Sequence, residues 1–181
     1  ALALLCERND VYSRQAAVLI AACAGYGLRR LEAFGLSTQQ FDAAQPLHLS
    51  LTRSGISDLK THGSRRIIAT ALADETMQEA LKMALNLANS SPRQPRYLFE
   101  SDSRDSHITS VSNVASAATL ALRAATGNPT IVMHHLRHSF ATLLGLAIMA
   151  PPKNTDRDLH QVVSRLLGPQ YLEVTRDILQ S

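Results

Sequence analysis

The sequence predicts a mainly α-helical domain with one small antiparallel β-sheet, an α+β arrangement. Of the 181 residues, 45% are hydrophobic but only 4% are aromatic and none is Trp, so we expect a core of aliphatic side chains packed between helices. Apolar positions follow helical spacing through most of the chain and alternate with polar positions around residues 47–52. A chain of this length is expected to form one well-buried domain, residues 1–181.

Two helices are expected near the start of the chain. Residues 12–25 are apolar and rich in Ala, which predicts a buried helix, and Gly25 and Gly27 interrupt the pattern. A short helix is expected over residues 28–34 and should end at Gly35, because glycine is common just after a helix. One side of this short helix is expected to carry apolar side chains, namely Leu28, Leu31 and Phe34.

The pattern then changes from helix to strand. Leu alternates with His, Ser and Thr over residues 47–52, which predicts a half-buried strand. Residues 57–61 and 65–70 flank Gly63 and predict a β-hairpin with this glycine at its tip. These segments are expected to form the small antiparallel sheet.

Helices return in the second half of the chain. The helix expected over residues 74–90 should bury four apolar side chains, those of Met77, Leu81, Leu85 and Leu87. An Ala-rich helix over residues 110–125 is stopped by Gly127-Asn128-Pro129, and another helix follows directly. The rest of the chain is expected to contain polar loops and two closing helices, with the loops over residues 90–96 and 150–156 and the helices over 159–167 and 172–179.

Charge and cysteine content narrow the class of protein. The net charge of +3 is mildly basic and compatible with a nucleic-acid partner. Cys6 and Cys23 lie far apart in apolar surroundings and are expected to be buried free thiols in a reducing cytoplasm. The apolar residues 1–5 lack a basic flank, and no apolar run approaches about 20 residues. We therefore expect a soluble intracellular protein and, because it starts without Met, an excised or processed fragment.

The most informative segment is H-H-L-R-H-S-F-A-T, at residues 134–142. On a helix, His134, Arg137 and His138 share one face because they are spaced i, i+3 and i+4. One fixed cation beside two imidazoles that can carry protons is suited to an anionic reaction centre. His135 is expected to point away from this face and to be incidental, and His138 to be a hydrogen-bonded structural residue.

This segment resembles, nearly letter for letter, the second signature box of the tyrosine recombinase (phage integrase) family, H-x-L-R-H-[ST]-x-A-T. Residues 27–32, G-L-R-R-L-E, resemble the first box, G-L-R-x-x-E. Lys60 lies on the predicted hairpin where the family carries its catalytic lysine, and residues 166–168, L-L-G, resemble the family's L-G-H motif. The resemblance covers essentially the whole chain, in the family's order, and places the usual N-terminal DNA-clamping domain outside it.

The resemblance implies site-specific DNA recombination or integration, in which a tyrosine attacks a phosphodiester and forms a 3′-phosphotyrosyl link. Arg29 and Arg137 would hold the non-bridging oxygens with bidentate donors, as a lysine cannot. Lys60 would protonate the leaving 5′-oxygen, and His134 would assist proton transfer or hold the phosphate. Glu32 would orient an arginine or cap a neighbouring element.

The same resemblance implies the partners and setting of the protein. We expect duplex DNA as partner, a tetramer on paired sites, and a bacterial cytoplasmic protein that associates with the nucleoid and belongs to a mobile genetic element. No cofactor is expected, because the phosphotyrosyl bond conserves the energy of the broken phosphodiester.

The sequence departs from the family near its end. Pro169 stands where the family has the histidine of L-G-H, and Ile178 stands where the nucleophilic tyrosine is expected. Tyr171 is the last tyrosine and lies too early. Three explanations remain open: a catalytically silent DNA-binding descendant, a chain that stops before its nucleophile, or missing residues after residue 150.

Two other classes of protein compete with an enzyme of this family. His134 and His138 could form a metal pair on a helix, but no Glu lies between them and Arg137 would repel a dication. A non-enzymatic, integrase-like DNA-binding regulator is the stronger alternative.

Overall fold

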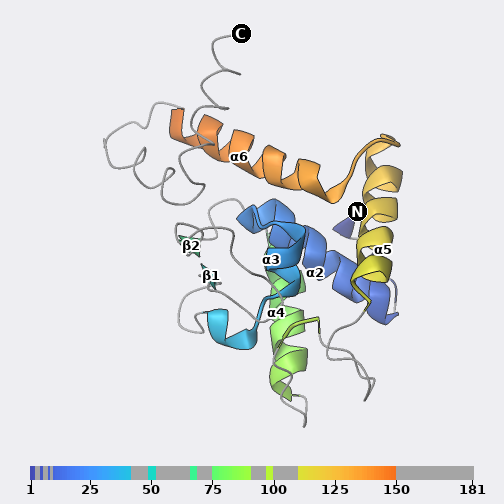
Figure 1. Ribbon diagram of the computed structural model, residues 1–181, viewed down its shortest axis with the longest axis vertical. Coiled ribbons are helices and arrows are strands. Elements are labelled where there is room, and N and C mark those ends of the chain that lie inside the picture. Colours follow the sequence, from blue (N-terminus) through green and yellow to red (C-terminus); the bar gives the residue numbers. More distant parts are fainter. Residues whose placement is uncertain are drawn as a thin grey trace.

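The computed structural model describes residues 1, 2, 5, 8, 10–41, 49–51, 66–68, 75–90, 97–99 and 110–149. Over these ranges the chain is mainly helical, which confirms the helical part of the predicted fold class (Figure 1). The elements in chain order are α2 (Val11–Tyr26), α3 (Arg30–Phe34), the 3₁₀ turn η1 (Thr38–Gln40), β1 (Leu49–Leu51), β2 (Arg66–Ile68), α4 (Glu75–Ser90), α5 (Val111–Thr126) and α6 (Met133–Met149).

Helix α2 is the centre of the core. Every residue from Ala16 to Cys23 is buried, as expected for a helix that is apolar on all sides. The helix begins after Asp10, whose carboxylate accepts hydrogen bonds from the Ser13 N–H at 2.8 Å and the Ser13 hydroxyl at 2.6 Å. It ends at Gly27, which adopts a left-handed conformation with φ +62°. The helix predicted over residues 12–25 is therefore confirmed, with Gly25 inside it.

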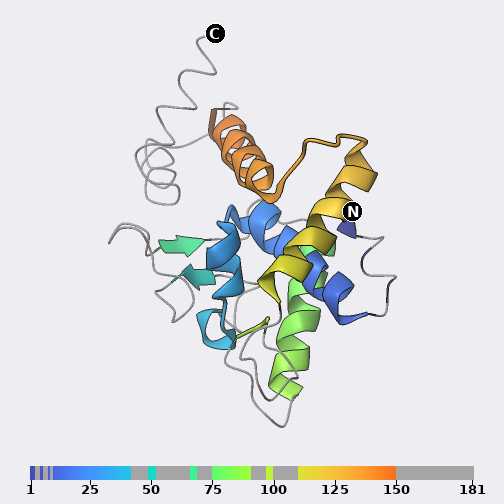
Figure 2. The same ribbon diagram turned by 45° about the vertical axis from the view of Figure 1, so that its right-hand side comes forward.

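The other helices pack around α2. Helices α3, α4, α5 and α6 all contact it. In both ribbon views α6 lies above α2 and α3, and α4 extends below them (Figures 1 and 2). This arrangement brings the first half of α6 against the turn that joins α2 to α3, so the two sequence motifs meet there.

Helix α3 is shorter than predicted. It begins at Arg30, and Arg29 is its N-cap residue in an extended conformation. Leu28 and Phe34 are buried, but Leu31 is 52% exposed, so the three do not form the single apolar side that was predicted. Because Leu28 lies before the helix, it does not continue a helical stripe through Leu31. Only the Phe34 side of α3 faces the core, where its ring lies 4.7 Å from that of Phe99.

Helices α4 and α5 lie close to their predicted bounds. In α4, Leu81 is fully buried, but Leu87 is 58% exposed, so the prediction that Leu87 is buried is wrong. The buried stripe continues instead to Ala88, one full i+7 step from Leu81. Helix α5 is capped by Ser110 and ends at Gly127, with φ +67°. None of the described helices is long and apolar enough to cross a membrane.

Two short strands pair beside α3. β1 and β2 are antiparallel, with Leu49 opposite Ile68 and Leu51 opposite Arg66. β1 lies within the strand predicted over residues 47–52, and its burial alternates as predicted, with both leucines buried and Ser50 exposed. The predicted hairpin tip at Gly63 and its first strand lie outside the described residues.

We predict that Tyr26→Phe stabilises the protein. Tyr26 is 1% exposed, and its hydroxyl has no hydrogen-bond partner in the part of the chain that the structure describes. An unsatisfied buried polar group costs about 1–3 kcal/mol, so its removal should raise Tm by about 2–12 °C. Differential scanning calorimetry measures this shift. Tyr12, which is 44% exposed, provides the control, since Tyr12→Phe should leave Tm unchanged. A fall in Tm for Tyr26→Phe would mean that the hydroxyl is satisfied.

Candidate functional site

The turn between α2 and α3 places Arg29 at the surface of the core. After the left-handed Gly27, the Leu28 N–H reaches back to the Ala22 carbonyl, with an N–O distance of 3.4 Å, and closes the end of α2. The Leu28 side chain is buried, and this anchors the chain on one side of the turn. Arg29 follows in an extended conformation, and its side chain is 35% exposed.

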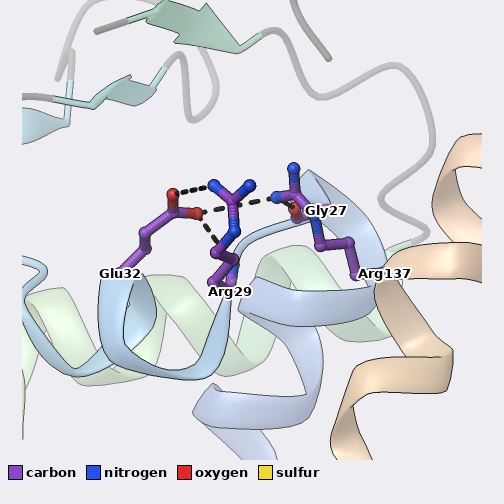
Figure 3. A network of polar contacts seen from close by, with 4 residues as sticks. All are labelled: Gly27, Arg29, Glu32 and Arg137. Atoms are coloured by element: carbon purple, nitrogen blue, oxygen red, sulfur yellow. Dashed lines mark hydrogen bonds and ion pairs between the residues drawn. The ribbon is translucent and has the colours of Figure 1, made fainter. Parts of the chain in front are cut away.

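Glu32 is the centre of the polar network shown in Figure 3. Its Oε2 accepts a hydrogen bond from the Arg29 backbone N–H at 2.8 Å, so it caps the first turn of α3. Its Oε1 accepts a hydrogen bond from Arg29 Nη1 at 2.9 Å. The same carboxylate lies 3.6 Å from Nη1 of Arg137, measured from Oε2. Glu32 thus orients an arginine, one of the two roles expected for it from the sequence, and it caps its own helix rather than a neighbouring element.

Arg137 reaches this network from α6. It is only 1% exposed, although charged side chains are rarely buried without a partner. Its Nη1 donates a hydrogen bond to the carbonyl oxygen of Gly27 and pairs with Glu32 (Figure 3). A buried guanidinium is tolerated here because an anion and a carbonyl dipole replace the lost water. The two arginines of the two sequence motifs therefore meet at one carboxylate.

His134 lies one helical turn before Arg137, on α6. It is exposed, and its ring meets the ring of His138 edge-on, with centroids 4.4 Å apart. Partial desolvation lowers the pKa of His134 from its ordinary value of 6.5, and the nearby His138 and Arg137 lower it further. The imidazole is therefore mainly neutral at pH 7, the form that can accept a proton.

The two other histidines of the motif are both exposed and make contacts of their own. His135 is not incidental, because its Nδ1 accepts a hydrogen bond from the Val132 backbone N–H at 3.1 Å and satisfies a donor at the start of α6. Its position, three residues into the helix from Val132, is the signal that could have revealed this role. His138 is exposed and contacts the His134 ring, and the hydrogen-bonded structural role expected for it stays a prediction.

Several predicted site residues lie outside the described residues. These are Lys60, the L-L-G segment at residues 166–168, Pro169, Tyr171 and Ile178, so the roles expected for them stay predictions. Within the described ranges, no three His, Cys, Asp or Glu residues gather in a way that could hold a metal ion. The only metal candidate from the sequence in this part of the chain is thus the His134–His138 pair, which has Arg137 beside it.

Cys23 lies in α2, close enough to Glu32 and Arg137 to feel their charges. It is a buried free cysteine, as expected, whereas Cys6 lies outside the described residues. Burial raises the pKa of the Cys23 thiol to about 12, and the negative charge of Glu32 acts in the same direction. The thiol therefore stays protonated and unreactive at neutral pH, and it contributes packing rather than chemistry to the site.

The site carries an excess of positive charge. Two guanidiniums share one carboxylate, and one of them, Arg29, is accessible to solvent. The described residues therefore offer fixed N–H donors and a neutral imidazole close together. Such a set can bind an oxyanion and exchange a proton next to it.

The chain has the tyrosine recombinase catalytic-domain fold. It superposes on the XerA recombinase with a TM-score of 0.59 and 19% identity, covering 90% of this chain and 50% of that one. It also superposes on the Tn1549 transposon integrase in complex with circular intermediate DNA, with a TM-score of 0.61 and 16% identity over 97% of this chain and 56% of the integrase chain. The same integrase in complex with transposon right end DNA gives a TM-score of 0.60.

These likenesses concern the fold. This chain spans about half the length of the solved chains that it matches. No protein-family model and no curated protein matches it by sequence. The function therefore has to be argued from the residues of the site.

We predict that Glu32→Gln destabilises the protein by about 3 kcal/mol, because it removes the anion between two guanidiniums, one of which is fully buried. Urea denaturation measures the loss. The matched control is Glu79→Gln, since Glu79 pairs with Lys82 at the same i, i+3 spacing on an exposed helix face. That substitution should cost no more than about 0.5 kcal/mol. Equal losses in the two variants would show that the buried network contributes nothing beyond a surface pair.

Proposed function

We propose that this chain is the catalytic core of a site-specific recombinase or integrase that cleaves and rejoins duplex DNA through a phosphotyrosyl intermediate. The observation that carries the proposal is the meeting of Arg29 and Arg137 at Glu32. These arginines come from two separate helical elements, in a fold that solved recombinases share. Proteins of that fold include an integrase solved with DNA, which supports duplex DNA as the partner.

In this proposal the two guanidiniums bind the non-bridging oxygens of one phosphodiester. Negative charge grows on these oxygens when a tyrosine hydroxyl attacks phosphorus, and donors that are already fixed stabilise this state without further reorganisation. Arg29 is the accessible member of the pair, and Arg137 is the member held by the core. Glu32 keeps both guanidiniums oriented before DNA arrives.

Two further groups complete the proposed chemistry. His134, neutral at pH 7, accepts a proton or holds the phosphate beside Arg137. Lys60 protonates the leaving 5′-oxygen. A tetramer on paired sites and a role in a mobile genetic element belong to the same proposal.

A second function is favoured by one observation in the sequence. Ile178 and Pro169 stand where the family has its tyrosine and its second proton-handling histidine. A chain with the arginine pair but without a nucleophile would bind DNA and form no covalent bond. This is the activity of an integrase-like DNA-binding or regulatory protein.

The test that separates the two functions is covalent trapping. The protein is incubated with nicked suicide duplexes of randomised sequence, and adducts are sought on a denaturing gel. If this chain carries its own nucleophilic tyrosine, the recombinase proposal predicts an adduct that Arg29→Ala and Arg137→Ala abolish. Salt-sensitive binding without an adduct would favour either the regulatory protein or a recombinase chain that lacks its nucleophile. An adduct abolished by Tyr171→Phe would identify Tyr171 as the nucleophile.

We predict that Arg29→Ala weakens binding to duplex DNA and lowers the magnitude of the salt slope, d log Kobs/d log[salt], by about 1. The reason is the loss of one phosphate contact. Fluorescence anisotropy between low and moderate salt measures both quantities. Lys82→Ala removes the same charge from an exposed position on α4 and serves as the control. If both variants lose affinity equally, binding follows net charge and the arginine pair is not the phosphate site.

We predict that DNA affinity rises as the pH falls from about 8 to 6, and that His134→Gln removes most of this dependence. In the free protein the pKa of His134 is lowered, whereas a phosphate beside the ring would favour the imidazolium and raise it. Binding therefore takes up a proton, so affinity must increase at lower pH. A profile that His134→Gln leaves unchanged would place the titrating group elsewhere.

A further inference from the structure

We propose that Gly27 and Phe140 are positioning residues that set the spacing between Arg29 and Arg137. The proposal rests on the proposed function, because the spacing matters only if the two guanidiniums share one phosphate. It concerns a contact between α6 and the turn that follows α2, and neither residue touches the phosphate itself.

The first observation is the absence of room at Gly27. Its Cα faces the ring of Phe140, and a Cβ added there would overlap Cδ1 and lie 2.8 Å from Cε1 and 2.9 Å from Cγ. Phe140 is only 3% exposed, so its ring cannot swing into solvent. The ring therefore packs directly on the glycine backbone.

The second observation is that α6 contacts the same glycine through another atom. The Gly27 carbonyl oxygen accepts the hydrogen bond from Arg137 Nη1. Arg137 and Phe140 are three residues apart, so they lie on one face of α6. Two contacts from one helix face to one residue fix both the rotation of α6 and its position along its own axis.

The third observation links this contact to the other arginine. Only Leu28 separates Gly27 from Arg29, and the Leu28 side chain is fully buried. Arg29 therefore follows Gly27 at a fixed position. A displacement of α6 relative to Gly27 would move Arg137 relative to Arg29. Catalytic groups lose about 100-fold in rate when they are misplaced by about 1 Å.

Gly127 shows that a helix-ending glycine does not require such a contact. It ends α5 in the same left-handed conformation as Gly27, with φ +67° against +62°. A Cβ added to Gly127 would meet no atom within 4 Å. Alanine at either position therefore meets the same backbone strain, but only at Gly27 does it also push against Phe140.

The experiment compares Gly27→Ala with Gly127→Ala, in the otherwise unchanged chain and in the Arg137→Ala background. Duplex DNA binding is measured as the salt slope and as Kd. We expect Gly27→Ala to lower the slope by about 1 and to weaken binding about tenfold, and Gly127→Ala to change Kd less than twofold. In the Arg137→Ala background, Gly27→Ala should raise Kd by less than a further twofold, because its effect on binding depends on Arg137. The proposal would be overturned if the losses of DNA affinity from Gly27→Ala and Arg137→Ala were additive. It would also be overturned if Gly27→Ala and Gly127→Ala changed Kd equally.

A second variant and a DNA-free readout complete the test. Phe140→Leu keeps Gly27 and removes the ring contact, so it should reproduce the slope change and its dependence on Arg137 if Gly27→Ala does not fold. The guanidinium ¹⁵N resonance of Arg137 should shift in Gly27→Ala and Phe140→Leu but not in Gly127→Ala. An unmoved resonance would overturn the positioning role. The two results can also diverge. If the Arg137 resonance shifts but Arg137→Ala leaves DNA binding unchanged, the positioning role is supported and the proposed function is rejected.

Discussion

The Glu32 carboxylate is the interaction on which the site depends. Without it, two guanidiniums would lie close together in a place where one of them is cut off from water, and their repulsion would oppose the packing of α6 on α2. With it, the carboxylate that offsets part of this positive charge is also the group that caps α3. The two carboxylate oxygens of Glu32 therefore link the start of α3, the packing of α6 and the arrangement of charges in the site.

The site is built largely from the ends of helices. Arg29 and Glu32 lie at the start of α3, the Gly27 carbonyl lies just past the end of α2, and His135 satisfies a donor at the start of α6. Backbone donors and acceptors at helix ends have no partner within the helix. Here they are satisfied by side chains that also fix the site, so local stability and arrangement of the site depend on the same contacts.

The two arginines differ in their accessibility to an anion. Arg137 is enclosed and held on two sides, which fixes its position at little entropic cost when a ligand arrives. Arg29 is accessible and makes its bond to Glu32 from the solvent side. A phosphate approaching from solvent would reach Arg29 first, and the enclosed Arg137 would limit where the phosphate can settle.

The sequence by itself determined the main helices and the identity of the arginine motifs. The apolar run of α2, the serine and glycine that bound α5 and the i, i+3 spacing of Arg29 and Glu32 are local signals, and local backbone geometry follows from them. Only the tertiary structure decided that Arg137 is buried, that Leu31 and Leu87 are exposed, and that Arg137 bonds to a carbonyl 110 residues away. A backbone carbonyl has the same chemistry in every residue. Its role as a partner arises only when packing brings a distant helix against it.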